Sequence, residues 1–240
     1  MANLNRFTQP LWDVDTFFIW NDFDKDQADT DAVDTVTDSG SVAMGDAANG
    51  TAVLTASDGT VADNDEAYLA TPNEVFIFAT NRCIYGRCRL KFVETTAGVG
   101  NVAFGFQNAV GADSIVDDGG TNIVKTSGST LAICKKDTEA VWTAVSACNG
   151  TATLTKSTTA AVTATWYLLE IICGDWDGVS MQVSYKVDGQ YLKDSNGLII
   201  RHTVLIASAT EMQMWVGRKL GAATNNDTVT VDYWYGAQTR

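Results

Sequence analysis

The sequence is poor in the residues that most often carry out chemistry. It contains one histidine, His202, so a Ser-His-Asp triad could be built only around that residue. Its five cysteines form no pair of Cys-x-x-Cys motifs, and too few histidines accompany them to hold zinc. We therefore expect no cofactor and no metal site, and the sequence indicates no catalytic residue.

Long apolar segments and a cationic leader are also missing. No stretch approaches 18 apolar residues, and the start MANLNRFTQPLW lacks a positive region followed by an apolar run. We expect no membrane partner and no signal peptide. Reduced thiols are then the default, although Cys83 and Cys88 are close enough in sequence to bridge across a turn, and that alternative stays open.

Positive charge is scarce. Lys and Arg number 16 against 29 Asp and Glu, so the formal net charge is −13, and the pI is near 4.3. Binding to nucleic acid requires cationic side chains on phosphates, which makes nucleic acid a poor partner for this chain.

Strand-forming pattern is what the sequence has in abundance. Two prolines, 20 glycines and many Thr, Val and Ala favour strands joined by glycine and Asx turns. The expected strands are 17–23, 51–56, 65–70, 75–80, 87–94, 102–107, 129–136, 140–146, 166–173, 178–188, 203–207, 212–218 and 228–236. Such spacing is typical of an antiparallel two-sheet β-sandwich. We expect an extended arm at 1–11 and one domain at 12–240.

The clearest pattern is a hairpin at 166–188. Residues 166–173 are apolar at nearly every position, which predicts a central strand covered on both faces. The next strand alternates, and its apolar set is Val179, Met181, Val183, Tyr185 and Val187. This alternation predicts that all five face the core. Asp177-Gly178 and Asp188-Gly189 supply the turns.

The first and last strands are predicted to pair and close the domain. Residues 17–23 are apolar on both faces, so we expect them to be buried within a sheet. In the last strand Val229, Val231, Tyr233 and Tyr235 alternate with Thr228, Thr230, Asp232 and Trp234, which places the two tyrosines on the same face as the valines.

An acidic segment follows the first strand. Asp22-x-Asp24-x-Asp26 begins like a Ca²⁺ loop, but Gln27 replaces the turn glycine and Val33 replaces the bidentate Glu. Residues 22–38 therefore read as a solvated acidic loop or an irregular cation site, and Asp117 and Asp118 lie in a second long loop at 111–128.

Four cations stand together in this acidic chain. In 87–94 Cys88, Leu90 and Phe92 are expected to point inward, which turns Arg87, Arg89 and Lys91 outward, and Arg82 lies just before them. One interpretation is a charged face or edge that blocks unwanted strand pairing. The other is a docking patch for an acidic protein surface.

The chain resembles the concanavalin A-like and laminin G-like jelly-roll family. The resemblance rests on Trp166-Tyr167-Leu168-Leu169-Glu170-Ile171, on the hairpin with Tyr185-Lys186-Val187-Asp188-Gly189, and on Val231-Asp232-Tyr233-Trp234-Tyr235. The Ala/Thr/Gly-rich strands, the missing signal peptide and the ending Tyr-Gly-Ala-Gln-Thr-Arg are also similar to structural proteins of tailed bacteriophages. This likeness implies a sandwich of two large antiparallel sheets.

Hydrolases of that family carry Glu-x-Asp-x-x-Glu on one strand, because retention needs two carboxyl groups about 5 Å apart. No such triplet occurs here, and Glu170 has no acidic neighbour before Asp175. Glu170 is interpreted as a carboxylate on a strand face, and an enzyme is disfavoured. The alternative, a hydrolase that lost or rearranged its carboxylates, would require evidence that the protein turns over a polysaccharide.

A lectin would need carboxylates in loops and an exposed aromatic residue to stack on sugar. Asp175, Trp176 and Asp177 supply that chemistry in one loop. The alternative is a turn whose Asp residues cap backbone amides and whose Trp covers the rim of the sandwich.

The leading functional hypothesis is a non-enzymatic virion protein, made in the host cytoplasm, that decorates or cements a phage head. Its expected partners are the major capsid protein or other virion proteins, contacted through Arg82, Arg87, Arg89, Lys91 or the 1–11 arm, and a homo-oligomer is expected. The alternative is a carbohydrate-binding, lectin-like module of a phage tail or fibre.

Overall fold

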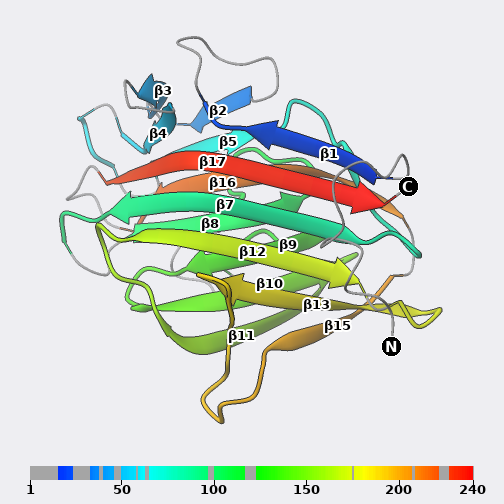
Figure 1. Cartoon of the computed structure of the whole chain (residues 1–240). Coiled ribbons are helices and arrows are strands. Elements are labelled where there is room, and N and C mark those ends of the chain that lie inside the picture. The colour runs from blue at the N-terminus through cyan, green and yellow to red at the C-terminus, as the bar shows by residue number, and fades with distance from the viewer. Residues whose placement is uncertain are drawn as a thin grey trace.

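Alternating apolar and polar residues fold this chain into two antiparallel sheets packed face to face (Figure 1). The computed structural model describes residues 16–23, 33–37, 40–45, 50–57, 59–62, 65–96, 100–116, 123–174, 176–206, 209–221 and 227–239. The predicted arm at 1–11, most of the acidic segment, Asp117, Asp118 and Asp175 lie outside these ranges. All regular elements in the described ranges are strands, which confirms the predicted fold class.

Sheet I is the nine-stranded sheet that faces the viewer in Figure 1. Its strands are β1 (Thr16–Asn21), β3 (Ser41–Gly45), β4 (Thr51–Thr55), β7 (Ile84–Val93), β12 (Trp166–Gly174), β13 (Ser180–Val187), β14 (Gln190–Tyr191), β15 (Arg201–Leu205) and β17 (Thr228–Thr239). Their order is β14-β13-β12-β7-β17-β4-β3. In addition, β1 pairs with β17, and β15 pairs with β13. The predicted pairing of the first and last strands is confirmed, with Trp20 opposite Tyr235.

Sheet II is the eight-stranded sheet behind it. Its strands are β2 (Val33–Thr37), β5 (Glu66–Ala70), β6 (Phe76–Phe78), β8 (Gly100–Gln107), β9 (Thr130–Lys135), β10 (Val141–Cys148), β11 (Thr151–Ala160) and β16 (Thr210–Leu220). The order is β11-β10-β9-β8-β16-β5-β2, and β6 pairs with β16. Strands β2, β3 and β14 were not among the ranges expected from the sequence, and β2 corrects the prediction of one continuous acidic loop.

The main core lies between the sheets, where the inner faces of their strands meet. On β7 the buried residues Cys88, Leu90 and Phe92 point inward as predicted. Gly86 is needed on this strand, because a Cβ there would lie 2.5 Å from the Phe106 ring of β8. Burial of aliphatic and aromatic side chains at roughly 1.5–3 kcal/mol each makes this interface the main source of stability.

The central hairpin forms as expected, with Leu169 opposite Val187 and Cys173 opposite Val183. Asp188 and Gly189 adopt φ values of 52° and 75°, the left-handed pair that a tight two-residue turn requires. Val179 corrects the pattern: it precedes β13 in the turn and is 61% exposed. The outer face of β12 is also only half-buried, because in the described part of the chain no further layer covers it.

A β-bulge at Asp232 overturns the alternation predicted for the last strand. Val231 pairs with Leu90 and Tyr233 with Arg89, so two positions on β17 separate partners that are adjacent on β7. The extra residue reverses the alternation beyond it, as bulges do. Trp234 therefore enters the core, fully buried, while Tyr233 and Tyr235 lie on the outer face of sheet I.

Strand β1 is likewise exposed on one face, contrary to the expectation of full burial. Phe17 and Ile19 pack against the core, whereas Phe18 and Trp20 are 50% and 45% exposed on the outer face. The five cysteines are free thiols. Cys83 and Cys88 are separated by extended chain, about 16 Å at the rise of a strand, which is too far for the bridge left open above.

Candidate functional site

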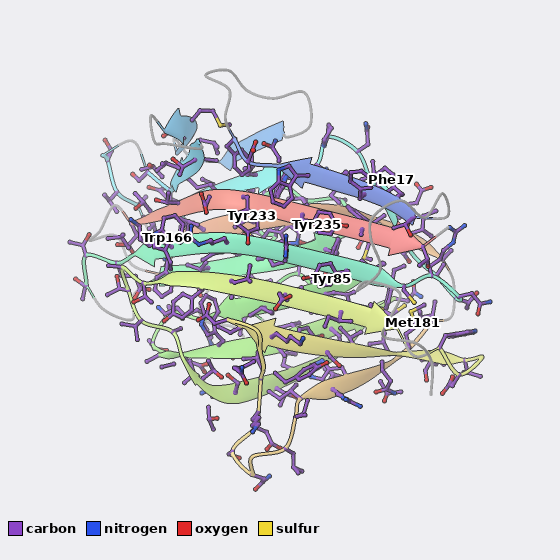
Figure 2. The ribbon with its side chains drawn as sticks, viewed as in Figure 1. Phe17, Tyr85, Trp166, Met181, Tyr233 and Tyr235 are labelled. Carbon is purple, nitrogen blue, oxygen red and sulfur yellow. The ribbon has the colours of Figure 1, made fainter. Side chains whose placement is uncertain are left out.

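The outer face of sheet I carries a row of aromatic and charged side chains that crosses six strands. The strand registers place the members of this row opposite one another in the order Trp20, Tyr235, Arg87, Glu170, Lys186 and Tyr191. Figure 2 shows Tyr235 and Tyr233 on β17, Tyr85 on β7 and Trp166 on β12, all on the sheet nearest the viewer. We call this surface, from β1 to β14, the aromatic face.

Arg87 lies at the centre of the aromatic face. Its guanidinium carbon is 5.8 Å from the ring centroid of Trp20 and 5.5 Å from those of Tyr233 and Tyr235. The Trp20 and Tyr233 rings are nearly parallel, with centroids 5.1 Å apart and planes at 17°. Cation–π attraction holds the guanidinium between the three rings. Three strands, one of them displaced by the bulge, are needed to build this contact.

A second group surrounds Trp166 at the start of β12. The Arg89 guanidinium and the Lys91 ammonium lie 4.6 Å and 5.1 Å from the centroid of its ring. Arg89 also donates to Asp232, the bulge residue, in an ion pair with both side chains part-exposed. Among the described residues no carboxylate lies within ion-pair distance of Lys91 or Arg87. Two of the three cations thus retain unneutralised charge.

Glu170 is already engaged on this face. Its Oε1 accepts a 2.5 Å hydrogen bond from the Tyr85 hydroxyl. Burial and then the Glu170 carboxylate raise the pKa of Tyr85, so the phenol stays protonated and remains a donor. Glu170 therefore orients Tyr85, and on β13 its cross-strand neighbour Lys186 lies 4.6 Å from the Tyr191 ring.

The four cations predicted as a cluster separate in the structure. Arg87, Arg89 and Lys91 share the outer face of β7, as the alternation predicted. Arg82 lies before the strand and donates from Nη1 to the backbone oxygen of Thr239 at 3.0 Å, so it fastens the end of β17. Contact of these cations with a partner stays a prediction.

In the loop at 175–177, the Asp177 carboxylate accepts hydrogen bonds from its own turn. Asp177 Oδ1 accepts from the amides of Val179 and Ser180 at 2.9 Å and 2.7 Å, and Oδ2 accepts from the Ser180 hydroxyl. These amides lower the pKa of Asp177 and keep it ionised. Trp176 packs against the core, which matches the capped-turn alternative, and a sugar or cation contact at this loop stays a prediction.

His202 lies inside the sandwich, 3% exposed. Its Nδ1 is 2.8 Å from Ser146 Oγ and 3.2 Å from the Tyr185 hydroxyl, and its Nε2 is 3.0 Å from Thr155 Oγ1. Burial lowers the pKa of His202 to about 4, so the ring is neutral. Because the three groups that contact its ring nitrogens are hydroxyls and Ser146 is buried, we interpret this contact as a core hydrogen-bond network and not as an activated nucleophile.

Buried charges form a linked network that the sequence did not reveal, with Arg218 Nη1 3.9 Å from Glu94 Oε1. Lys135 donates to Glu94 and Arg218 donates to Asp227, and all four side chains are buried. Burial lowers the pKa of both Lys135 and Arg218. The opposite charges neutralise one another inside the protein, and these buried side chains are not accessible to a ligand.

Sequence reasoning found the cations of the aromatic face but missed their aromatic partners. Trp20 and Trp166 were predicted to be covered, and the bulge that turns Tyr233 and Tyr235 to the outer face was not predicted. One available signal was Trp234, an apolar residue in the otherwise polar set of Thr228, Thr230 and Asp232.

The described residues contain no group of three or more His, Cys, Asp and Glu side chains able to hold a metal ion. No helix in the same part of the chain is long and apolar enough to span a membrane.

No family model and no curated protein matches this sequence, but solved structures match its fold. Lectin II from Ulex europaeus aligns with a TM-score of 0.60 and 12% identity over 93% of this chain and 99% of the lectin. The carbohydrate recognition domain of Emp47p aligns with a TM-score of 0.58 and 9% identity over 92% of this chain and 94% of that domain.

An endo-β-1,4-glucuronan lyase from the fungus Trichoderma reesei is similar to the same extent, with a TM-score of 0.58 and 12% identity over 92% of this chain and 94% of the lyase. At these identities the likeness establishes the fold alone, a concanavalin A-like jelly-roll sandwich. Since lectins and a lyase share it, the residues of a site must decide the function.

Proposed function

We propose that this protein is a carbohydrate-binding, lectin-like module and that the aromatic face of sheet I is its binding surface. The observation that carries the proposal is the group of aromatic rings from three strands, with Trp20 45% exposed, set among cations on the outer face of sheet I. Exposed apolar area of this kind, surrounded by polar groups, marks a binding surface in soluble proteins.

The chemistry of the face suits a sugar chain. The C–H face of a pyranose ring packs against an aromatic ring, and Trp20, Tyr233 and Trp166 supply such rings. Sugar hydroxyls need polar partners beside the stacked ring, and Arg87 and Lys186 provide donors there. Because the rings sit on strands, they hold their positions without a ligand.

The similarity to lectins and to the Emp47p recognition domain supports this choice over the capsid-decoration hypothesis. The similarities reported above do not bear on a phage partner, so the capsid role, the homo-oligomer and the virion location stay predictions. Binding of the purified protein to purified phage heads would test them. The similarity to the lyase keeps the absence of catalysis a prediction as well, which an assay for cleaved polysaccharide would test.

A glycan array and pull-downs with insoluble polysaccharides test the proposal. The full chain should bind at least one glycan, and Trp20→Ala should weaken that binding at least about tenfold, a loss of about 1.4 kcal/mol. Trp176→Ala is the matched control, because it removes an indole from the rim of the sandwich. Binding that depends on Trp176 and calcium, and not on Trp20, would move the site to the rim loop.

A further inference from the structure

We propose that the ligand of the aromatic face is an acidic polysaccharide, one that carries carboxylate or sulfate groups along its length. This inference rests on the proposed function and specifies the class of glycan. It places the acidic groups of the polymer against Arg87, Lys91 and Lys186 and the sugar rings against the aromatic residues between them.

The local charge of the face opposes that of the protein. The outer faces of β7, β12, β13 and β17 carry four cations, Arg87, Arg89, Lys91 and Lys186, against two carboxylates, Glu170 and Asp232. The difference is two positive charges on a chain whose formal net charge is −13. A polyanion repelled by most of the surface would therefore be attracted to this face, which orients its approach.

The pairing of these charges leaves the cations available. Asp232 is used by Arg89 and Glu170 accepts from Tyr85. Lys91, half-buried beside Trp166, has no described carboxylate partner, and neither has Arg87 between its three rings. A cation held against aromatic rings is partly desolvated and gains more from an added anion than a fully hydrated one does.

The spacing of the cations suits a repeating polymer. Arg87, Arg89 and Lys91 follow one another at every second residue of β7, roughly 7 Å apart at the rise of a strand. Lys186 lies two strands away, roughly 10 Å across the sheet. A polysaccharide with one acidic group per sugar or disaccharide can place several acidic groups against these cations at once. The binding energies of several weak contacts then add up.

A second copy of this chain is the competing occupant, and the face suits it less well. The exposed apolar area is interrupted by a cation at every second position of β7, whereas the core of a stable homodimer interface is depleted in charge. A flexible polyanion satisfies these cations and rings together. We therefore assign the face to the polysaccharide.

Calorimetric titration with matched pairs of polymers tests the inference. The pairs are polygalacturonate with its fully methyl-esterified form, and dextran sulfate with dextran, so that each neutral member keeps its backbone. We expect at least one acidic member to bind at least about tenfold more tightly than its neutral partner. Affinity should fall as salt shortens the Debye length from about 10 Å at 0.1 M to about 3 Å at 1 M. The two pairs separate carboxylate from sulfate recognition.

Variants assign the effect to the face. Lys91→Gln should weaken binding of the acidic polymer several-fold and reduce its salt dependence, and Lys91→Arg should restore both. Lys156→Gln is the control, because Lys156 is an exposed lysine of β11 on sheet II, paired with Glu139, and it should change neither.

Each outcome decides between the claims. Binding of acidic and neutral members alike, or only of neutral ones, would overturn the acidic specificity and leave carbohydrate binding intact. Equal losses in Lys91→Gln and Lys156→Gln would show attraction to cations anywhere on the protein and overturn the site. Absence of binding to these polymers and to every glycan of the array, with dimers in light scattering that Trp20→Ala dissociates, would overturn both proposals.

Discussion

The two sheets share one core but differ in what covers their outer faces. Residues from 110–116 and 123–124 lie over sheet II, where they complete a second apolar cluster made of Tyr68, Ala70, Ala103, Ile115, Ile123, Val124, Ala132, Cys134, Val145 and Trp215. On sheet I no described segment covers the outer face over β7, β12 and β17, and aromatic rings there contact cations. Because the main core lies between the two sheets, the aromatic face of sheet I can serve binding without a covering layer of its own.

Charge differs between the two regions in the same way. Near sheet II three ion-paired cations, Lys135, Arg218 and Lys219, are buried, and Lys219 contacts both Glu66 and the exposed Asp113. Burial alone would lower the pKa of Lys219, but those two carboxylates more than offset it and raise that pKa. On sheet I Arg87 and Lys91 have no carboxylate within ion-pair distance among the described residues. The difference separates charges that hold the fold together from charges that remain available to a ligand.

The largest effect should come from breaking a buried ion pair. Lys135→Met leaves Glu94 buried without its main partner, and we expect a loss of about 3–5 kcal/mol in the free energy of unfolding. Urea denaturation measures it, and Glu94→Gln combined with Lys135→Met should recover part of the loss. A loss below about 1 kcal/mol in Lys135→Met would mean that this pair does not stabilise the fold.

Removing the cover of sheet II should cost nearly as much. Ile115 is fully buried against that sheet, so Ile115→Ala is expected to lower the free energy of unfolding by about 2–5 kcal/mol. Phe18→Ala, on the open face, removes a larger but half-exposed side chain and should cost less. Equal losses in the two variants would contradict the distinction between a covered and an open face.

Acid should destabilise the protein through His202. The unfolded chain takes up a proton near pH 6.5, whereas the folded state resists protonation until about pH 4 because the ring is buried. The free energy of unfolding should therefore fall as the pH drops from about 6.5 to about 4, by up to about 3 kcal/mol. His202→Gln removes this contribution, so a variant with the same pH dependence as the parent would show that His202 is not its source.

The smallest effect is expected at the exposed pair of the aromatic face. Arg89→Gln breaks the contact with Asp232, and such part-exposed pairs contribute about 0–1 kcal/mol. Thermal unfolding should barely change, while affinity for an acidic glycan should fall. A large loss of stability would place Arg89 with the structural charges and not with the binding surface.

Much of the fold could be predicted because it depends on a period of two. The alternation in β7 placed Cys88, Leu90 and Phe92 inside and three cations outside, and the Asp188-Gly189 turn set the register of the central hairpin. Patterns of this kind follow from local geometry alone.

The aromatic face depended on features that no local pattern contains. Position 232 pairs with nothing on β7, a property of two strands that are distant in sequence, and it reverses the orientation of Tyr233 and Tyr235. Trp20 looked buried because β1 is apolar on both faces, yet it lies beside β17 with one face open. The cations were therefore found from the sequence, and their aromatic partners required the assembled sheet.

The most direct test of the binding surface is an NMR titration that follows the indole N–H signals of the tryptophans as a bound glycan is added. The protein has seven tryptophans, and those of Trp20 and Trp166 should shift with saturation while those of the buried Trp142, Trp215 and Trp234 stay unchanged. A shift confined to Trp176 would place the site at the rim loop and contradict the assignment of carbohydrate binding to the outer face of sheet I.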